Sequence, residues 1–226
     1  MGGRMIRSAA GSPSYCSADA YNQFLTAVIR LDSADALLRA ACAVSKHAFC
    51  DQQFSDVTSE LRRLTNAVEQ RARTRQTSRL IASLNEVLFQ TEGFDVAPSD
   101  APIFSYLPQV LGMKLGSAEA LCMIYHVVAD RLHLHTEAIQ LSDRFCIRIR
   151  AGKSVYFLDP QHRRCLSPDE ARQAALEARL PGCGVVTREG WLRQILCNVQ
   201  AALARADHRD DLEAVLELQD LLSLAE

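Results

Sequence analysis

Apolar residues recur at helical spacing through the first half of the chain. The repeat runs over residues 33–44, 55–72 and 77–94. Apolar positions three and four residues apart, with polar residues between them, are typical of amphipathic helices that bury one face. We expect Asp32 or Ser33 to cap the first helix, Ser55 to cap the second and Gly93 to end the third.

A fourth segment, residues 116–134, is apolar on nearly every side. From Ala120 to Ala129 only His126 is polar, and Ser117 precedes this run as a candidate N-cap. A helix without a polar face belongs inside a domain. We therefore expect this segment to form the centre of the core.

A predicted strand pair follows the central helix. Residues alternate in character from Phe145 to Arg150, a turn follows at Gly152 and Lys153, and a second strand runs to Asp159. Helices are predicted before and after this small antiparallel sheet. The fold class is therefore expected to be α+β and rich in helix.

The two ends of the chain differ from the middle. Residues 1–18 are rich in Gly, Ser and Arg and are expected to be flexible. Residues 167–180 open with a Ser-Pro signal for the start of a helix. Residues 185–226 predict two helices, and a lone helical hairpin cannot bury its own apolar faces. We expect this tail to dock on a core formed by residues 19–184 or on a partner.

Composition narrows the class of function. The chain has 226 residues, of which 48% are hydrophobic and 23% charged, and its net charge is −2. Such a charge gives no general attraction to phosphate backbones, so nucleic acid is not expected as a partner. No apolar run is long enough to cross a membrane, and the first residues lack a secretory pattern. We expect a cytoplasmic protein without membrane contact.

Metal binding and disulfides have little support in the sequence. The eight cysteines form no CxxC pair and are expected to be reduced thiols, most of them buried. His133 and His135 are the nearest to a ligand pair, but no Cys or acidic ligand stands at a suitable spacing. We expect no metal and no cofactor.

Thiol catalysis has specific requirements that can be compared with the central helix. A catalytic cysteine typically sits at a helix N-terminus, where the dipole lowers its pKa, beside a His base. The start of this helix, Gly116 to Glu119, has no cysteine. Cys122 lies one turn further in, and His126 follows it at i+4. Because burial raises the pKa of a thiol, we interpret this pair as packed core residues.

Several stretches of the chain, in order, resemble the landmarks of a known family. They are SLNEVLFQTEGF, SYLPQVL, IYHVVADRLHL, RFCIRI, FLDPQHRRCLSPDEA and LCNVQAALARADHRDDLEAVLELQDLLSL. A capped buried helix, a strand pair and an Asp-Pro resemble the transglutaminase-like fold of the cysteine-protease-like superfamily. The chain is most similar to its bacterial invasion-regulator-related branch. The resemblance implies a papain-like core with a tetratricopeptide-like helical tail.

The resemblance places the catalytic triad of the superfamily at Ala118, Arg144 and Asp159. Alanine carries no nucleophile, and a guanidinium cannot act as a base near neutral pH. Only Asp159 matches the triad, so we assign no catalytic residue. Arg144 either pairs with Asp159 or extends into solvent, and the sequence leaves both open.

These features predict a non-catalytic protein-interaction or regulatory protein on a degenerate transglutaminase-like fold. Its partner is expected to be a protein, unidentified by the sequence, that contacts the groove between the core and the tail. The oligomeric state stays open. The alternative is a cysteine-dependent peptidase or acyltransferase that uses Cys122 or Cys146 with His126 or His162.

Overall fold

The computed structural model describes residues 11–141, 144–166, 169–170, 173 and 183–225, with only the backbone of Arg164 and Cys183. The helix expected over residues 167–180 lies mostly outside the described residues. The described α-helices are α2 (Ala18–Val28), α3 (Ala34–Lys46), α4 (Phe54–Ala72), α5 (Thr77–Asn85), α6 (Leu107–Met113), α7 (Ala118–Arg131), α9 (Arg188–Arg205) and α10 (Arg209–Ala225).

The strands form one sheet and one short pair. The five-stranded antiparallel sheet has the order β6 (Arg164–Leu166), β5 (Ser154–Asp159), β4 (Arg144–Ala151), β3 (His135–Leu141) and β7 (Cys183–Val185). The short parallel pair joins β1 (Asp95–Val96) and β2 (Leu115–Gly116). This helix-rich architecture with a small antiparallel sheet confirms the expected α+β class.

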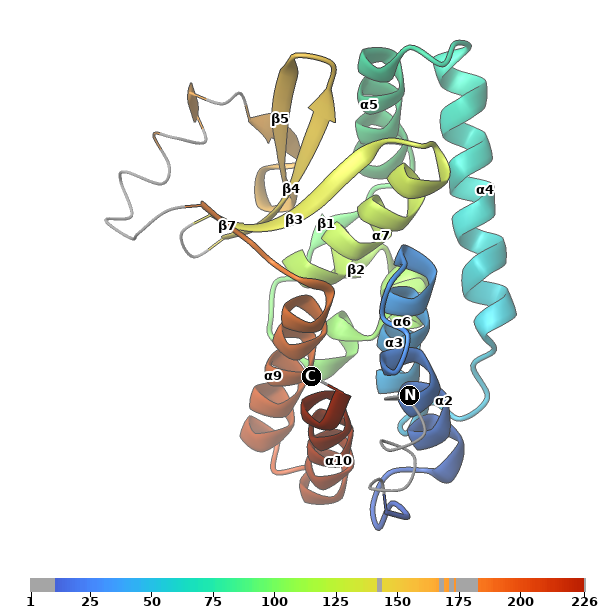
Figure 1. Cartoon of the computed structure of the whole chain (residues 1–226), viewed down its shortest axis with the longest axis vertical. Helices are drawn as coiled ribbons and strands as arrows, with labels where there is room; N and C mark the ends of the chain where they lie inside the picture. The colour runs from blue at the N-terminus through green and yellow to red at the C-terminus, as the bar shows by residue number, and fades with distance from the viewer. Residues whose placement is uncertain (1–10, 142–143, 167–168, 171–172, 174–182, 226) are drawn as a thin grey trace.

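Helix α7 runs through the middle of the molecule (Figure 1). The Ser117 hydroxyl accepts a hydrogen bond from the backbone N–H of Ala120 at 3.2 Å and so caps it. The sheet packs against α7 on one side, and α3, α4 and α9 pack on others. The prediction of a capped and almost fully buried central helix is confirmed.

The β4–β5 hairpin has the register that the sequence predicted. Ala151 faces Ser154 across the turn, and Gly152 has φ +61°, a left-handed conformation that glycine adopts easily. Phe145, Ile147 and Ile149 of β4 face the main core that contains α7. Cys146, on the opposite face of the same strand, belongs to a small second cluster with Ile139, Leu141 and Leu166.

Helix α4 buries the predicted stripe and spans much of the molecule's length (Figure 1). Ser55 does not cap it, contrary to expectation, because the helix already begins at Phe54 with Gln53 as the N-cap. Gln53 makes no side-chain capping bond. The earlier start has a tertiary reason, since Phe54 packs against the main core and lies 4.1 Å below the Arg39 guanidinium.

The helix expected over residues 77–94 changes its winding halfway. After α5 the chain continues as a π-helix, η1 (Glu86–Thr91), which accommodates an extra residue in its turn. Gly93 has φ +74° and ends the segment as predicted. His133 lies before β3 with φ +59°, so it does not share a strand with His135.

The tail helices α9 and α10 dock on the N-terminal hairpin of α2 and α3 (Figure 1). Helix α10 packs on α2, and α9 packs on α3, on α7 and on the 3-10 helix η2 (Pro102–Ser105). Trp191 of α9 donates its indole N–H to the Glu119 carbonyl at 3.2 Å. Docking of the tail on the chain itself was the first of the two expected outcomes.

The last residues before α2 are attached to α10. The Glu217 carboxylate accepts hydrogen bonds from the backbone N–H groups of Ser14, Tyr15 and Cys16, at 2.7, 3.1 and 2.9 Å. Ser17 then caps α2. The end of the segment expected to be flexible is therefore held by a carboxylate from the other end of the chain.

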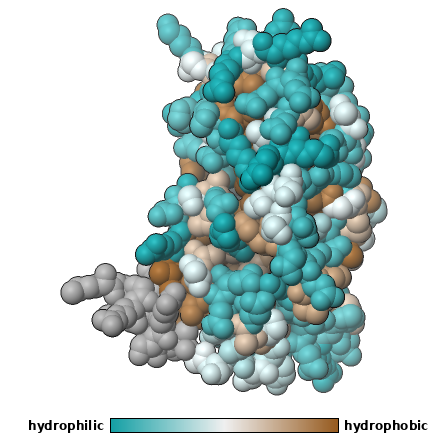
Figure 2. Space-filling model, turned by 90° about the vertical axis from the view of Figure 1, so that its right-hand side faces the viewer, coloured by the Kyte–Doolittle hydropathy of each residue, from teal (hydrophilic) through white to brown (hydrophobic). Residues whose placement is uncertain are grey.

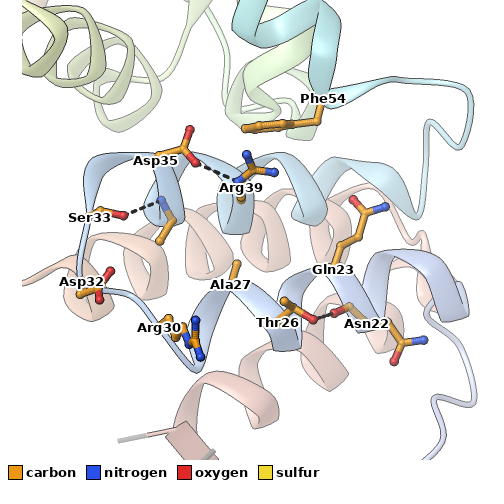
Figure 3. A pocket seen from close by; sticks show the side chains of 11 residues that line it. Asn22, Gln23, Thr26, Ala27, Arg30, Asp32, Ser33, Asp35, Arg39 and Phe54 are labelled. Atoms are coloured by element: carbon orange, nitrogen blue, oxygen red, sulfur yellow. Dashed lines mark hydrogen bonds and ion pairs between the residues drawn. The ribbon is translucent and has the colours of Figure 1, made fainter.

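The face that carries α4 is largely hydrophilic, with hydrophobic side chains showing in places (Figure 2). Beside the start of α4, a hollow with a cavity volume of about 610 Å³ opens along α2 and α3 (Figure 3). Charged residues of both signs line it, among them Arg30, Arg39, Asp32 and Asp35.

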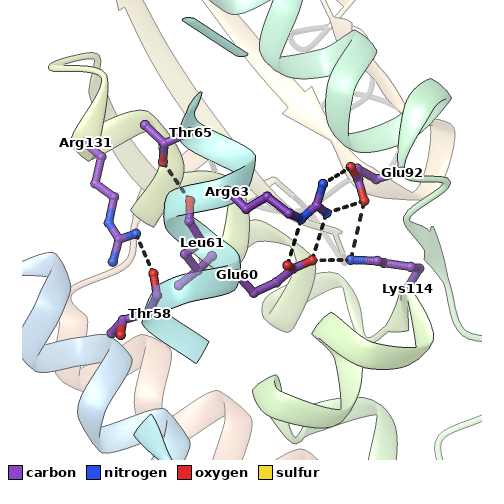
Figure 4. A network of polar contacts seen from close by, with 8 residues as sticks. All are labelled: Thr58, Glu60, Leu61, Arg63, Thr65, Glu92, Lys114 and Arg131. Atoms are coloured by element: carbon purple, nitrogen blue, oxygen red, sulfur yellow. Dashed lines mark hydrogen bonds and ion pairs between the residues drawn. The ribbon is translucent and has the colours of Figure 1, made fainter. Parts of the chain in front are cut away.

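A network of four charges joins α4 to the turn after η1 and to the end of α6 (Figure 4). Arg63 donates to Glu60 and to Glu92, with shortest distances of 2.8 and 2.6 Å. Lys114 lies 2.8 Å from Glu60 and 3.6 Å from Glu92. The two cations and two anions alternate, so each charge has opposite charges as its neighbours.

Candidate functional site at the start of helix α7

The start of α7 is the position where a cysteine would be activated by the helix dipole. Ala118 is its first residue, directly after the Ser117 cap. The Ser117 backbone N–H donates to the Phe104 carbonyl at 2.7 Å, so the η2 segment holds the helix start in place. The side chain at the first helical position is a methyl group and offers no nucleophile.

Asp159 is the second component of the candidate site, at the end of β5. Its side chain is fully buried and accepts three hydrogen bonds. Arg144 Nη1 lies 3.1 Å from Oδ2, which confirms the ion pair that the sequence left open. The backbone N–H of Gln161 donates to Oδ1 at 3.0 Å. A buried carboxylate needs such partners because its desolvation is otherwise unfavourable.

His162 is the third partner of Asp159. Its Nδ1 lies 2.7 Å from Asp159 Oδ2, and half of the imidazole side chain is exposed. The contact arises because the 3-10 helix η3 (Pro160–His162) turns the chain back over its own cap residue, Asp159. The sequence suggests His162 only as a partner for a cysteine, so its contact with Asp159 is a finding of the structure. The Asp-Pro-Gln-His spacing, with Pro directly after a capping Asp, was the available signal.

The Cys122 thiol is held inside the core. Its Sγ lies 3.6 Å from the Phe145 carbonyl oxygen, and none of the residue is exposed. Burial raises the pKa of this thiol well above its ordinary value, and the nearby acidic groups of Cys146, Glu119 and Asp159 add to the shift. A neutral thiol is a poor nucleophile, so this environment suppresses thiolate chemistry.

His126 lies on α7 one turn after Cys122 but uses another partner. Its Nδ1 lies 2.7 Å from the Thr136 hydroxyl, and its ring packs 5.5 Å from that of Trp191. Burial lowers the pKa of His126, with an opposing contribution from Asp130, so the imidazole is kept neutral. These contacts match the interpretation of a packed core histidine.

The structure brings some of the predicted site residues together and separates others. Arg144, Asp159 and His162 form one hydrogen-bonded group, and η3 packs against α7. Cys146 faces the second cluster on the far side of the sheet. The group thus contains an imidazole held by a carboxylate, an arrangement that can orient a general base, while the side chain at the start of α7 is a methyl group without a nucleophile.

The groove expected between core and tail is filled by the chain's own side chains. The apolar residues of α9 and α10 that face the rest of the molecule are buried: Trp191, Leu192, Ile195, Leu196, Val199, Leu203, Val215, Leu218, Leu221 and Leu222. A partner would have to displace this packing to use the groove. The expectation of an open contact surface there is therefore wrong.

Among the described residues, no group of three or more His, Cys, Asp or Glu side chains is arranged to hold a metal ion. Over the same part of the chain, no helix is both long enough and apolar enough to span a bilayer.

The fold and the site together define a helix-rich α+β arrangement in which a buried helix packs against a small antiparallel sheet. A family model described as the transglutaminase-like superfamily matches residues 55–209. The match covers more than half of the chain, which therefore belongs to the transglutaminase-like superfamily. It begins in the first turn of α4 and ends at the first residue of α10. No curated protein and no solved structure gives a significant match.

Proposed function

We propose that this protein is a non-catalytic member of its superfamily that acts by protein-protein interaction, as a regulator. The observation that carries the proposal is Ala118 at the first position of α7. The helix dipole would lower the pKa of a cysteine at this position and so favour the nucleophilic thiolate. The alanine methyl group cannot ionise and cannot act as a nucleophile.

The contacts of Arg144 support the same proposal. The resemblance gives this position to the catalytic histidine, and the guanidinium found there bonds the buried Asp159. An Arg-carboxylate pair is a stable charge-assisted contact, and a guanidinium does not release a proton near neutral pH. Arg144 thus stabilises the buried Asp159 carboxylate and cannot act as a general base.

We extend the proposal to the finer features that the resemblance implied. They are membership of the invasion-regulator-related branch, a tetratricopeptide-like character of the α9–α10 hairpin, and a cytoplasmic location. The proposed partner is a protein, and neither nucleic acid nor a membrane is proposed. The near-neutral net charge of −2 supports the exclusion of nucleic acid.

A second candidate function, a cysteine-dependent peptidase or acyltransferase, is favoured by one observation. His162 is oriented by Asp159 and half exposed, as a general base would be. This function requires Cys122 or Cys146 to become accessible, and each is fully buried. It therefore requires an opening of the core as well as a lowered thiol pKa.

Site-resolved alkylation distinguishes the two functions. Native protein is treated with iodoacetamide across a range of pH, and each thiol is followed by mass spectrometry. Cys50 and Cys197 are exposed and serve as internal controls that label freely. We expect Cys122 and Cys146 to label only after denaturation. Rapid labelling of either thiol in native protein, well below a pKa of about 8.5, would establish the enzyme instead.

A further inference from the structure

Arginines gather at the corner where α4 ends and α5 begins. Residues 71–79 contain four of them: Arg71, Arg73, Arg75 and Arg79. All four are exposed. Figure 2 looks onto the side that carries α4, and its upper end, where α4 gives way to α5, is covered mainly by hydrophilic side chains. This group of four is called the arginine corner below.

Two of the four charges are neutralised within the fold. Arg71 forms an ion pair with Glu86, and Arg75 lies 3.9 Å from Glu69. Arg73 and Arg79 have no side-chain hydrogen bond or ion pair with any residue that the structure describes. The corner thus carries two uncompensated positive charges on a chain whose net charge is −2. Exposed cations without partners attract anions over about one Debye length, near 8 Å at physiological salt.

Two hollows flank the corner, and Arg73 lines both. The larger has a volume of about 790 Å³ and lies between α4 and α5, where Arg71 and Arg79 also line it. The smaller has a volume of about 380 Å³ and includes Arg75 and His133. A ligand that fills both must pass over Arg73. The shape therefore favours an extended occupant over a compact ion.

The start of α5 adds to the positive potential of the corner. Its N-cap residue, Gln76, makes no side-chain capping bond, and its first turn contains no acidic residue. The positive end of the helix dipole therefore has no carboxylate from its own turn. Thr77, the first residue of α5, lines the smaller hollow.

We propose that the arginine corner binds an acidic segment of a partner protein. This inference rests on the proposed function and names the chemistry of its partner. Planar guanidinium groups bind carboxylates by paired hydrogen bonds, and the two without partners, Arg73 and Arg79, can each bind an acidic side chain of a peptide. Glu69 and Glu86 position two of the arginines and leave Arg73 and Arg79 for the ligand.

The lining of the hollows argues against other polyanions. Neither hollow is lined by Phe, Tyr or Trp, so neither offers an aromatic platform on which bases could stack. The described large hydrophobic residues with high exposure are Tyr15, Met113, Val185, Leu216 and Leu224, and none of them lies at the corner. A membrane surface would therefore find no apolar anchor there.

The test is binding of a fluorescent poly-glutamate peptide to the full chain, followed by anisotropy. The variant Arg73→Gln/Arg79→Gln removes the two uncompensated charges. A matched control, Arg30→Gln/Arg209→Gln, removes two exposed arginines from the helical hairpins. Each lost contact lowers affinity by a few-fold, so the corner variant should bind on the order of tenfold more weakly. The control should bind like the native chain, and binding should weaken as salt is raised.

Several results would overturn this inference. They are absence of peptide binding by the native chain, equal losses in the corner variant and the control, and retention of affinity by the corner variant. Double-stranded DNA and vesicles containing phosphatidylserine are tested in parallel. Tighter binding of either, lost in the corner variant, would assign the corner to that polyanion. The proposed absence of thiol catalysis is decided separately by alkylation, so each proposal can fail on its own.

Discussion

At the scale of single residues, Asp159 is the clearest case of a buried charge that depends on its neighbours for compensation. It is a fully buried carboxylate held by Arg144, by His162 and by one backbone N–H. Removing one partner of a buried charge leaves part of its desolvation uncompensated. The Arg144–Asp159 contact is therefore a determinant of stability, whatever the ancestry of the two positions.

We predict that Arg144→Met lowers the free energy of unfolding by about 1–3 kcal/mol, because the Asp159 carboxylate loses a charged donor while His162 remains. Arg150→Met is the matched control on the same strand. Arg150 is 58% exposed and contacts Glu137 at the surface, so its loss should change stability by about 0.5 kcal/mol or less. Urea denaturation measures both. Equal losses of unfolding free energy for the two substitutions would show that the buried Arg144–Asp159 pair stabilises the fold no more than the surface contact of Arg150 does.

At the scale of elements, the start of α7 depends on a close approach between β2 and α6. A Cβ added to Gly116 would lie 2.5 Å from Val110 Cγ1, inside any real carbon contact. Val110 is fully buried and cannot move aside without disturbing the core. Packing against Val110 therefore leaves no room for a side chain at position 116, directly before the Ser117 cap.

We predict that Gly116→Ala destabilises the protein by about 1–3 kcal/mol through this overpacking. Gly112→Ala is the control, because a Cβ at Gly112 meets nothing within 4 Å and alanine favours helix. Thermal unfolding followed by circular dichroism measures both. If the clash is the cause, the double variant Gly116→Ala/Val110→Ala will lose less than the sum of the two single losses.

The four-charge network makes the stability of the fold depend on pH in the acid range. Hydrogen bonds from Arg63, with further contributions from Lys114, lower the pKa of Glu60 to about 2. The pKa of Glu92 is lowered too, mainly by its hydrogen bond to Arg63. A group whose pKa is lower in the folded than in the unfolded state stabilises the fold above its unfolded pKa, and this contribution is lost as pH falls.

We predict that stability declines as pH falls from about 4.5 toward about 2, the interval between the ordinary and the folded pKa of Glu60. Glu60→Gln should lower the free energy of unfolding at pH 7 by about 1–2 kcal/mol, after allowance for solvent screening, and should flatten the acid decline. Glu213→Gln, at an exposed position of α10, should leave the profile unchanged. Urea titrations at a series of pH values measure this, and parallel profiles for Glu60→Gln and the native chain would contradict the prediction.

At the scale of the whole molecule, the N-terminal and C-terminal helices pack against each other. Helices α2 and α3 pack on α9 and α10, and the Glu217 carboxylate holds the residues before α2. The one tryptophan of the chain, Trp191 of α9, is buried, donates its indole N–H to the first turn of α7 and packs against the ring of Phe145 in β4. The helical hairpins are therefore part of one packed body with α7.

We predict that deletion of residues 187–226 yields a chain that aggregates or lacks a cooperative unfolding transition, because the apolar faces of α2, α3 and α7 lose their cover. Removal of residues 224–226 is the control, since Leu224 is 49% exposed. In the control, Trp191 should keep the emission of a buried indole. A soluble chain with a sharp transition after the long deletion would show that the tail is an independent appendage.

The helices and the hairpin could be predicted because their signals are local. Residues 116–134 are apolar on nearly every side, which indicates a central helix, and the turn at Gly152 sets the β4–β5 register. The N-cap of α4 was misplaced by two residues, Ser55 instead of Gln53, because Phe54 joins the core and this tertiary contact overrides the capping preference of Ser55. Propensity was outweighed there by burial.

The candidate site was predicted in part. The positions Ala118, Arg144 and Asp159 followed from resemblance, and the ion pair between the last two was one of two open outcomes. The third partner, His162, depends on how η3 folds back on its cap residue, a direction that residue types alone suggest weakly. The filled groove was missed because it depends on where α9 and α10 dock, which their own pattern does not specify.

By itself, the sequence determined that this chain has a buried central helix, an antiparallel hairpin and no cysteine at the dipole-positive end of that helix. These follow from spacing within a few turns of chain, where backbone geometry dictates which side chains meet. Only the tertiary structure decided that His162 joins Asp159, that the tail covers α2 and α3, and that the arginine corner is flanked by two hollows. Contacts between distant segments depend on loop paths and on competition among all apolar faces, and no single stretch of sequence contains that information.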